Sequence, residues 1–223
     1  MIWNRGVVVA EKCWIKIEAQ MKLNVREELK AKKQAYVQEE ILTAAATLFA
    51  ETGVRAVTID DIASSLGYTK SVVYYYFKNK NQVLWEIFER IHKAWSEDMV
   101  SILESNLSPD ERLGEMIKKH ALNVIQRKAW TAIYFRDQGE LTDDQQKVIV
   151  KRKREYDQLF KTAYSKGVEA GIFRDIPPYL IVSSIIGMCN FTQAWYKEKG
   201  PLKPDEVAGH YVEIILNGCR ASA

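Results

Sequence analysis

Cysteine and histidine are scarce in this chain, which has three of each among its 223 residues. Cys13, Cys189 and Cys219 lie far apart, form no CxxC pair and are odd in number, so a disulfide framework is not indicated. The three histidines lack the spacing of zinc ligands. We therefore expect no bound metal, and reduced thiols as in a cytoplasmic protein.

Long apolar runs and a strong net charge are also missing. The sequence has no uninterrupted apolar stretch of about 18 residues, so a membrane-spanning helix is not expected. The formal net charge is only +3, which excludes a bulk polycation. Any binding to nucleic acid must therefore come from a local surface. The sequence has neither a Ser-His-Asp signature nor a glycine-rich phosphate loop, so we do not expect an enzyme.

Residues 58–80, TIDDIASSLGYTKSVVYYYFKNK, predict two short helices joined by a tight turn. Thr58 and Asp61 have the spacing of a capping box at the start of the first helix. Gly67 stands where that helix must stop, and Thr69 can cap the second. The first helix has one apolar stripe at i, i+3, i+4 and i+7, formed by Ile59, Ile62, Ala63 and Leu66.

The second of these helices carries three consecutive tyrosines at positions 74–76. Val72, Val73 and Phe77 would face inward, which turns polar and aromatic side chains outward. The alternative is that the tyrosines only pack a small domain. Three successive residues cannot all face the core, however, because each is turned about 100° from the last. A helix, a glycine turn and a second helix with hydrogen-bonding side chains outside are typical of a helix-turn-helix DNA-binding unit.

This part of the sequence resembles the TetR family of transcriptional repressors. The matching motifs are FAETG at 49–53, TIDDIA at 58–63, GYTK at 67–70 and VYYYFKNK at 73–80. One position departs from the family pattern, since many members have histidine where this chain has Tyr76. A tyrosine hydroxyl can still donate to a phosphate, so the expected role is kept.

The geometry of a recognition helix in the major groove predicts two groups of DNA-binding residues, one for base edges and one for phosphates. The N-terminal half of such a helix contacts base edges in the major groove, whereas helix ends meet phosphates. The expected base-reading residues are Lys70, Ser71, Tyr74 and Tyr75, and the expected phosphate-binding residues are Thr58, Tyr76 and Lys80.

The rest of the chain predicts an all-α protein. It is rich in Leu, Ile, Ala, Glu and Lys, with Gly and Pro between the periodic stretches. Helices are expected over about 81–106, 109–127, 129–137, 143–170, 178–199 and 204–217. With three helices before them, these give about nine in all. The expected domains are an N-terminal extension or arm (1–30), a helix-turn-helix DNA-binding domain (31–80) and a helical-bundle domain for ligand binding and dimerisation (81–223).

The first 21 residues have two interpretations. Met21 begins a basic segment, MKLNVREELKAKK, which leads into the first helix, so residues 1–21 could be an added, mobile extension. Alternatively, they form an extra helix that packs on the body through Trp3, Val7, Trp14 and Ile17.

The C-terminal domain resembles the TetR-family branch that senses acyl-coenzyme A thioesters and represses fatty-acid, aromatic-acid or sterol-ring catabolism. The motifs are FRDQGELT at 135–142, GIFR at 171–174, GMCN at 187–190 and WY at 195–196, followed by GPL at 200–202. The resemblance implies a small-molecule effector of the acyl-coenzyme A class and no cofactor. An architectural DNA-binding protein without an effector would not need so large a second domain.

Aromatic and polar residues of three C-terminal helices predict a ligand pocket. Asn190 lies in an apolar helix, where a buried amide needs a partner in the protein or in a ligand. The run Lys151–Arg154 could bind coenzyme A phosphates, with Arg152 and Tyr156 one helical turn apart. Single aromatic stripes more often form core, and basic runs more often form solvated faces. The expected pocket residues are Trp130, Tyr134, Phe135, Arg152, Tyr156, Phe160, Asn190, Phe191 and Trp195.

The expected partners are double-stranded operator DNA, a small-molecule effector and a second copy of the chain. A palindromic operator requires two reading heads about one helical turn apart. The predicted dimer interface comprises residues 179–195 and 206–216, where Ser183, Ser184, Gly187, Ala208 and Gly209 are small. We expect an acyl-coenzyme A effector to release the repressor from DNA. The alternative is a free aromatic or drug-like effector with no role for Arg152.

Overall fold

The computed structural model describes the backbone of residues 4–221 and the side chains of Met21 and of residues 24–221. The packing suggested for Trp3, Val7, Trp14 and Ile17 therefore lies outside the described side chains. Within the part of the chain that the structure describes, no helix combines the length and the hydrophobicity that crossing a membrane requires.

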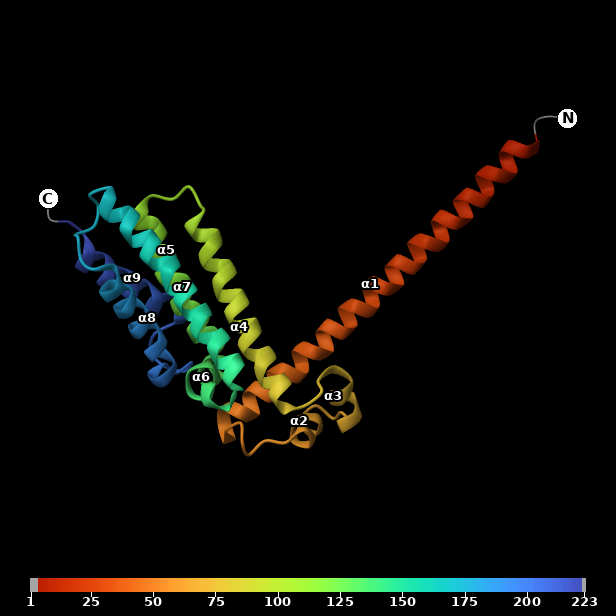
Figure 1. The fold of residues 1–223 in the computed structure, drawn as a ribbon, viewed down its shortest axis with the longest axis horizontal. Coiled ribbons are helices and arrows are strands. Elements are labelled where there is room, and N and C mark those ends of the chain that lie inside the picture. Colours follow the sequence, from red (N-terminus) through yellow and green to blue (C-terminus); the bar gives the residue numbers. More distant parts are fainter. Residues whose placement is uncertain (1–3, 222–223) are drawn as a thin grey trace.

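Nine α-helices and one short 3₁₀ helix form the fold across residues 4–221, which confirms the expected all-α class. Figure 1 shows a bundle at one end, a small head at the base, and a long helix that passes through the head and projects beyond it. The elements are α1 (Asn4–Thr52), α2 (Ile59–Ser65), α3 (Lys70–Tyr76), α4 (Lys80–Leu103), α5 (Pro109–Gln126), α6 (Lys128–Arg136), η1 (Gln138–Glu140), α7 (Asp143–Glu169), α8 (Pro178–Trp195) and α9 (Pro204–Cys219).

The head forms where α2 and α3 pack on the C-terminal part of α1. Phe49 of α1, Ile62 of α2 and Val73 of α3 are all fully buried in a shared core. The predicted capping box is present, since the Thr58 hydroxyl accepts from the Asp61 amide. Gly67 adopts a φ of +67° in the turn, a conformation that glycine takes without a Cβ penalty.

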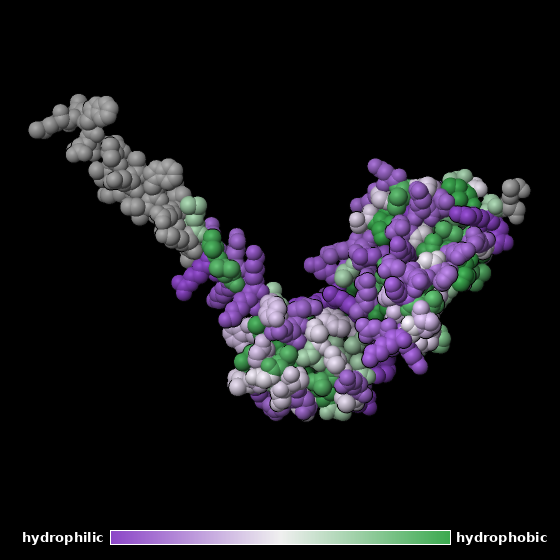
Figure 2. Space-filling model, turned by 180° about the vertical axis from the view of Figure 1, so that it is seen from behind, coloured by the Kyte–Doolittle hydropathy of each residue, from purple (hydrophilic) through white to green (hydrophobic). Residues whose placement is uncertain are grey.

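The bundle is built around α5, which packs against α4, α6, α7, α8 and α9. Its apolar face is fully buried, as the side chains of Leu113, Met116 and Ile117 show. A capping box at Ser108 and a proline at the first helical position start this helix where the sequence predicted. The hydrophilic surface of the bundle is visible from behind in Figure 2.

Helix boundaries agree with the sequence wherever a cap is local. The Asn79 side chain accepts from the Gln82 amide, which starts α4 at Lys80, next to the predicted start. The first helix begins earlier than expected, because α1 already starts at Asn4 within the expected extension or arm, while it ends before Gly53 as the FAETG motif indicated. That glycine has a φ of +86°, which stops the helix.

Candidate DNA interface and ligand cavity

The exposed side of α3 brings the four expected base-reading residues together. Lys70 begins the helix and Ser71 follows it, both exposed. Tyr74 and Tyr75 are 46% and 68% exposed, whereas Val73 between these pairs is fully buried. Large polar-tipped aromatic side chains this open to solvent do not stabilise the head by burial. Their positions suit contact with a second molecule.

Two neighbours on this surface, Asp60 and Tyr74, contact the ammonium group of Lys70. Its Nζ lies 2.8 Å from Asp60 Oδ2 and 5.9 Å from the centre of the Tyr74 ring. The hydrogen bond to Asp60 raises the pKa of Lys70, so the ammonium stays charged at neutral pH. Exposed ion pairs of this kind contribute little stability, and the ammonium can exchange its partner for a DNA acceptor.

Two of the expected phosphate-binding residues already have protein partners. The Thr58 hydroxyl and backbone N–H both lie within 2.8 Å of Asp61 Oδ2. Tyr76 is half-buried, and its ring meets the ring of Tyr75 edge-on at 4.9 Å. Thr58 thus caps α2, and Tyr76 supports the more exposed Tyr75.

Lys80 has a structural role that the sequence did not reveal. Its ammonium donates to the carbonyl oxygens of Val54, Arg55 and Val57 at 2.7, 3.2 and 2.7 Å. An ammonium has three donors, so none remains for a phosphate. In this structure Lys80 holds the loop between α1 and α2 in place, and its expected phosphate contact stays a prediction.

A partly open cavity of about 170 Å³ lies in the bundle, between five helices. Its wall is mostly aromatic, and several polar groups point to it. The lining residues are His92 and Trp95 of α4, His120 of α5, Tyr134 and Phe135 of α6, Lys153, Tyr156 and Asp157 of α7, and Ile186 and Asn190 of α8.

A hydrogen-bonded triad crosses the cavity wall. The Tyr156 hydroxyl lies 2.8 Å from His120 Nδ1, and His120 Nε2 lies 3.1 Å from Asn190 Oδ1. Burial lowers the pKa of His120 to about 4, so its imidazole is neutral at pH 7. The consistent proton arrangement has Tyr156 donating to Nδ1 and Nε2–H donating to Asn190. The predicted need of Asn190 for a partner is thus met by His120.

The cavity also contains polar groups that a ligand could engage. His92 is 5% exposed, and its Nδ1 has no hydrogen-bond partner among the described residues. Burial lowers the pKa of Lys153 and raises that of Asp157. The Lys153 ammonium donates to Gln138 Oε1 at 2.7 Å. An unpaired buried nitrogen is costly, and a ligand atom that paired with it would bind favourably.

Four of the nine expected pocket residues line this cavity: Tyr134, Phe135, Tyr156 and Asn190. Phe160 stands behind the wall, with its ring centre 6.0 Å from that of His120. Trp130 is buried elsewhere, with the Arg127 guanidinium 5.1 Å from its ring centre. The sequence missed His92, Trp95, His120, Lys153, Asp157 and Ile186.

Three further expected pocket residues, Arg152, Phe191 and Trp195, also lie outside this cavity. Phe191 and Trp195 are 67% and 43% exposed on the outer side of α8. Arg152 forms an ion pair with Glu89 of α4, and its guanidinium lies 5.7 Å from the centre of the Trp85 ring. Arg152 instead lines an open groove between α4 and α7, which adjoins the cavity at His92 and Tyr156.

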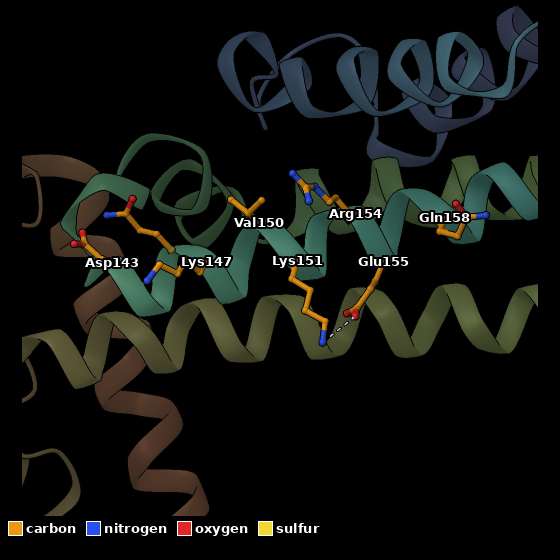
Figure 3. A pocket seen from close by; sticks show the side chains of 8 residues that line it. Asp143, Lys147, Val150, Lys151, Arg154, Glu155 and Gln158 are labelled. Carbon is orange, nitrogen blue, oxygen red and sulfur yellow. Dashed lines mark ion pairs between the residues drawn. The ribbon is translucent and has the colours of Figure 1, made fainter.

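The basic run on α7 does not form a single anion clamp. Lys151 and Arg154 lie on an open hollow along the outer face of α7, where their side chains diverge (Figure 3). Lys151 Nζ lies 3.7 Å from Glu155. Lys153 turns inward to the cavity, and Arg152 turns to α4. Successive helical residues point in different directions, so four adjacent charges cannot converge on one ligand.

Helix α6 joins the cavity to the head. Tyr134 and Phe135 line the cavity, and the next residue, Arg136, ends the helix. Its guanidinium donates to the Phe49 and Ala50 carbonyls at 2.6 and 3.1 Å. These carbonyls belong to the last turn of α1, where a cation also complements the helix dipole.

Two protein-family models match the chain. Residues 41–87 match "Bacterial regulatory proteins, tetR family", and residues 106–219 match "Tetracyclin repressor-like, C-terminal domain". This chain belongs to the TetR family of transcriptional regulators. It is therefore a transcriptional repressor of the TetR type rather than an enzyme, and such regulators bind operator DNA and small-molecule effectors.

Individual relatives of this TetR-family chain include regulators of known structure. The transcriptional repressor KstR2 of Mycolicibacterium smegmatis is 31% identical over 186 residues, which cover 82% of this chain and 91% of the relative. The ketosteroid regulator KstR2 of Mycobacterium tuberculosis has a TM-score of 0.77 at 26% identity, covering 83% of this chain and 95% of that one. AibR, solved with isovaleryl coenzyme A and operator DNA, has a TM-score of 0.70 at 25% identity, covering 79% and 96%.

Proposed function

We propose that this protein is a cytoplasmic repressor that binds palindromic operator DNA as a homodimer and is released by an acyl-coenzyme A thioester. The observation that carries the effector proposal is the aromatic-lined cavity, whose wall includes two residues of the helix that caps α1. The complex of AibR with isovaleryl coenzyme A and operator DNA supports the ligand class.

The size of the cavity favours a ligand of which only one part, the acyl group, enters it. At about 170 Å³, it is smaller than the roughly 300–1,000 Å³ of a site for a whole drug-sized molecule. A compact acyl group would fill it, with its carbonyl oxygen near the polar groups of His92 or Asn190. The coenzyme A portion would follow the adjoining α4–α7 groove, where Arg152 could exchange Glu89 for a phosphate.

Release from DNA would begin at α6. An acyl group that displaces Tyr134 or Phe135 moves the helix that ends in Arg136 and so disturbs the contact with the Phe49 and Ala50 carbonyls. A ligand shifts such an equilibrium only by its preference for one state. Moving the protein from mostly DNA-competent to mostly incompetent takes about a 10⁴-fold preference.

The dimer would form through the outer faces of α8 and α9. Large apolar side chains are exposed there, with Tyr179 60%, Phe191 67% and Ile214 60% accessible. Gly187 lies in the same exposed face of α8, and a Cβ added there would meet nothing within 4 Å. Figure 2 shows hydrophobic patches at this outer edge of the bundle. Clustered exposed apolar side chains are typical of an interface.

A gel-shift titration tests the effector. We expect an acyl-coenzyme A with a compact acyl group to abolish the shift of operator DNA, while coenzyme A and the matching free acid leave it unchanged. Release by the free acid alone would instead support the alternative, a free aromatic or drug-like effector. If neither ligand releases the DNA, the thioester proposal is wrong.

A further inference from the structure

The part of α1 that projects beyond the head carries a stripe of unpaired positive charge. Arg26, Lys30 and Lys33 are exposed, and none has an ion-pair partner among the described residues. At 100° per residue they lie within about 60° of one another around the helix. In the same projection Glu27 lies about 60° beyond Lys30 and Glu28 about 160° from Arg26, so both lie outside the stripe.

The stripe lies on the side of α1 that carries the DNA-reading unit. Gln34 Nε2 donates to the Tyr75 hydroxyl of α3 at 3.2 Å, and the Tyr68 hydroxyl, in the turn before α3, donates to Glu40 Oε2 at 2.8 Å. Around the helix, Gln34 and Glu40 lie about 80° to one side and 40° to the other side of Arg26. The basic stripe therefore lies between Gln34 and Glu40 around the helix, on the face that contacts the helix-turn-helix.

The projecting segment of α1 begins next to the exposed surface of α3, where Gln34 bonds Tyr75. Figure 1 shows α1 leaving the head beside α3, and Figure 2 shows hydrophilic side chains where it leaves. The family model for the DNA-binding domain begins only at residue 41, so the stripe lies outside it. Arg26 and Lys33 are about 10 Å apart along the helix axis, a length over which duplex DNA presents several phosphates.

We infer that Arg26, Lys30 and Lys33 form a second, sequence-independent contact with the phosphate backbone, beside the bases that α3 reads. The inference rests on operator binding by α3 and adds an arm to it. Charge complementarity and continuity with the α3 surface favour DNA as the occupant. A neighbouring exposed apolar strip of α1, which includes Val25 and Leu29, would favour a second protein chain instead.

The salt dependence of DNA binding tests the arm. The variant R26Q/K30Q/K33Q should bind operator and unrelated DNA more weakly by the same factor. Its plot of log affinity against log salt should be less steep than that of the wild type by about 2.7 per subunit, because each phosphate contact contributes about 0.9. The matched control, K118Q/K161Q/K166Q, removes three charges from the bundle and should keep the wild-type slope.

The outcomes separate the arm from the proposed function. An unchanged slope in R26Q/K30Q/K33Q, with operator binding intact in the wild type, overturns the arm and leaves the repressor function standing. A change in sedimentation instead of slope would also overturn it, and would assign the segment to a protein interface. A wild type that binds no operator sequence overturns both.

Discussion

A neutral histidine, His120, lines the cavity, and its burial has a cost that depends on pH. His120 is 1% exposed and bonds Tyr156 on one side and Asn190 on the other. Both ring nitrogens of the neutral imidazole have a hydrogen-bond partner in this triad. Protonation would place an uncompensated cation among aromatic rings, because no carboxylate bonds this imidazole.

We predict that the free energy of unfolding falls as the pH is lowered from about 6.5 to about 4. The unfolded state binds a proton near pH 6.5, whereas His120 in the folded state does so only near its lowered pKa of about 4. Proton binding therefore favours the unfolded chain between about pH 6.5 and pH 4, and the free energy of unfolding stops falling for this reason below about pH 4. By pH 5 the loss is about 2 kcal/mol for this histidine. His92 has the same lowered pKa, also from burial, and adds a similar loss.

Urea denaturation at pH 8 and pH 5 measures this loss, and two variants apportion it. H120Q should remove about half of the pH dependence that the two buried histidines cause. H210Q, at an exposed histidine, leaves both buried histidines in place and should keep the pH dependence that they cause. Equal pH dependence in H120Q and the wild type would contradict the assignment.

Two lysines of the head differ in role although both were expected at the DNA. K70A should relax discrimination at one base position by about 1–3 kcal/mol without changing the melting temperature, because its ion pair is exposed.

K80M should lower the free energy of unfolding by about 1.5–3 kcal/mol, because three carbonyls lose a charged donor.

Thermal melting and binding to single-base operator variants distinguish these effects. A stable K80M protein that loses affinity equally for all DNA would restore Lys80 to the phosphate-binding group. A K70A protein with undiminished discrimination would remove Lys70 from base reading.

At the scale of the helix, local sequence signals predicted where helices begin, whereas they did not predict which side chains the packing turns toward the cavity. Caps such as Thr58 with Asp61 act within one turn, so the sequence contains the whole cause. The cavity depends on which face of each helix turns inward. Helix α8 is apolar around much of its circumference, so periodicity could not show that Asn190 faces inward and Phe191 outward. His120 was missed because its partners are 36 and 70 residues away.

Helix α6 makes a prediction that belongs to this scale. R136M removes the donors to the Phe49 and Ala50 carbonyls but leaves the cavity residues in place. We expect effector affinity in the absence of DNA to stay near that of the wild type. The coupling between effector and operator should fall by about 1–3 kcal/mol, the usual size of such coupling.

Calorimetry with the effector and gel shifts with and without it measure the two quantities. The control is R55Q, which removes an exposed pair between Arg55 and Glu140 at the same joint and should change the coupling little. Full release of R136M from DNA by the effector would exclude α6 as the route.

At the scale of the whole molecule, the helix-turn-helix head and the helical bundle are separate parts of the same fold (Figure 1). A single recognition helix contacts only a few base pairs, so affinity for a palindrome requires a second head at a fixed distance. The bundle can supply that distance only if two copies pair through a rigid surface. The exposed apolar side chains of α8 and α9 are the surface that such pairing would bury.

The variant F191E/I214E should therefore be a folded monomer that no longer binds the palindromic operator tightly. Both side chains are exposed in one chain, at 67% and 60%, so a carboxylate there costs the monomer little. In an apolar two-fold interface each new carboxylate would be buried without a partner on both subunits, which opposes pairing. The control V148E places a charge on α7, where Val148 is 38% exposed, and should remain a dimer. Sedimentation velocity at micromolar concentration gives the mass, and a helical circular dichroism spectrum confirms folding. A monomeric wild type, or an F191E/I214E protein that stays dimeric, would place the dimer interface elsewhere or remove it.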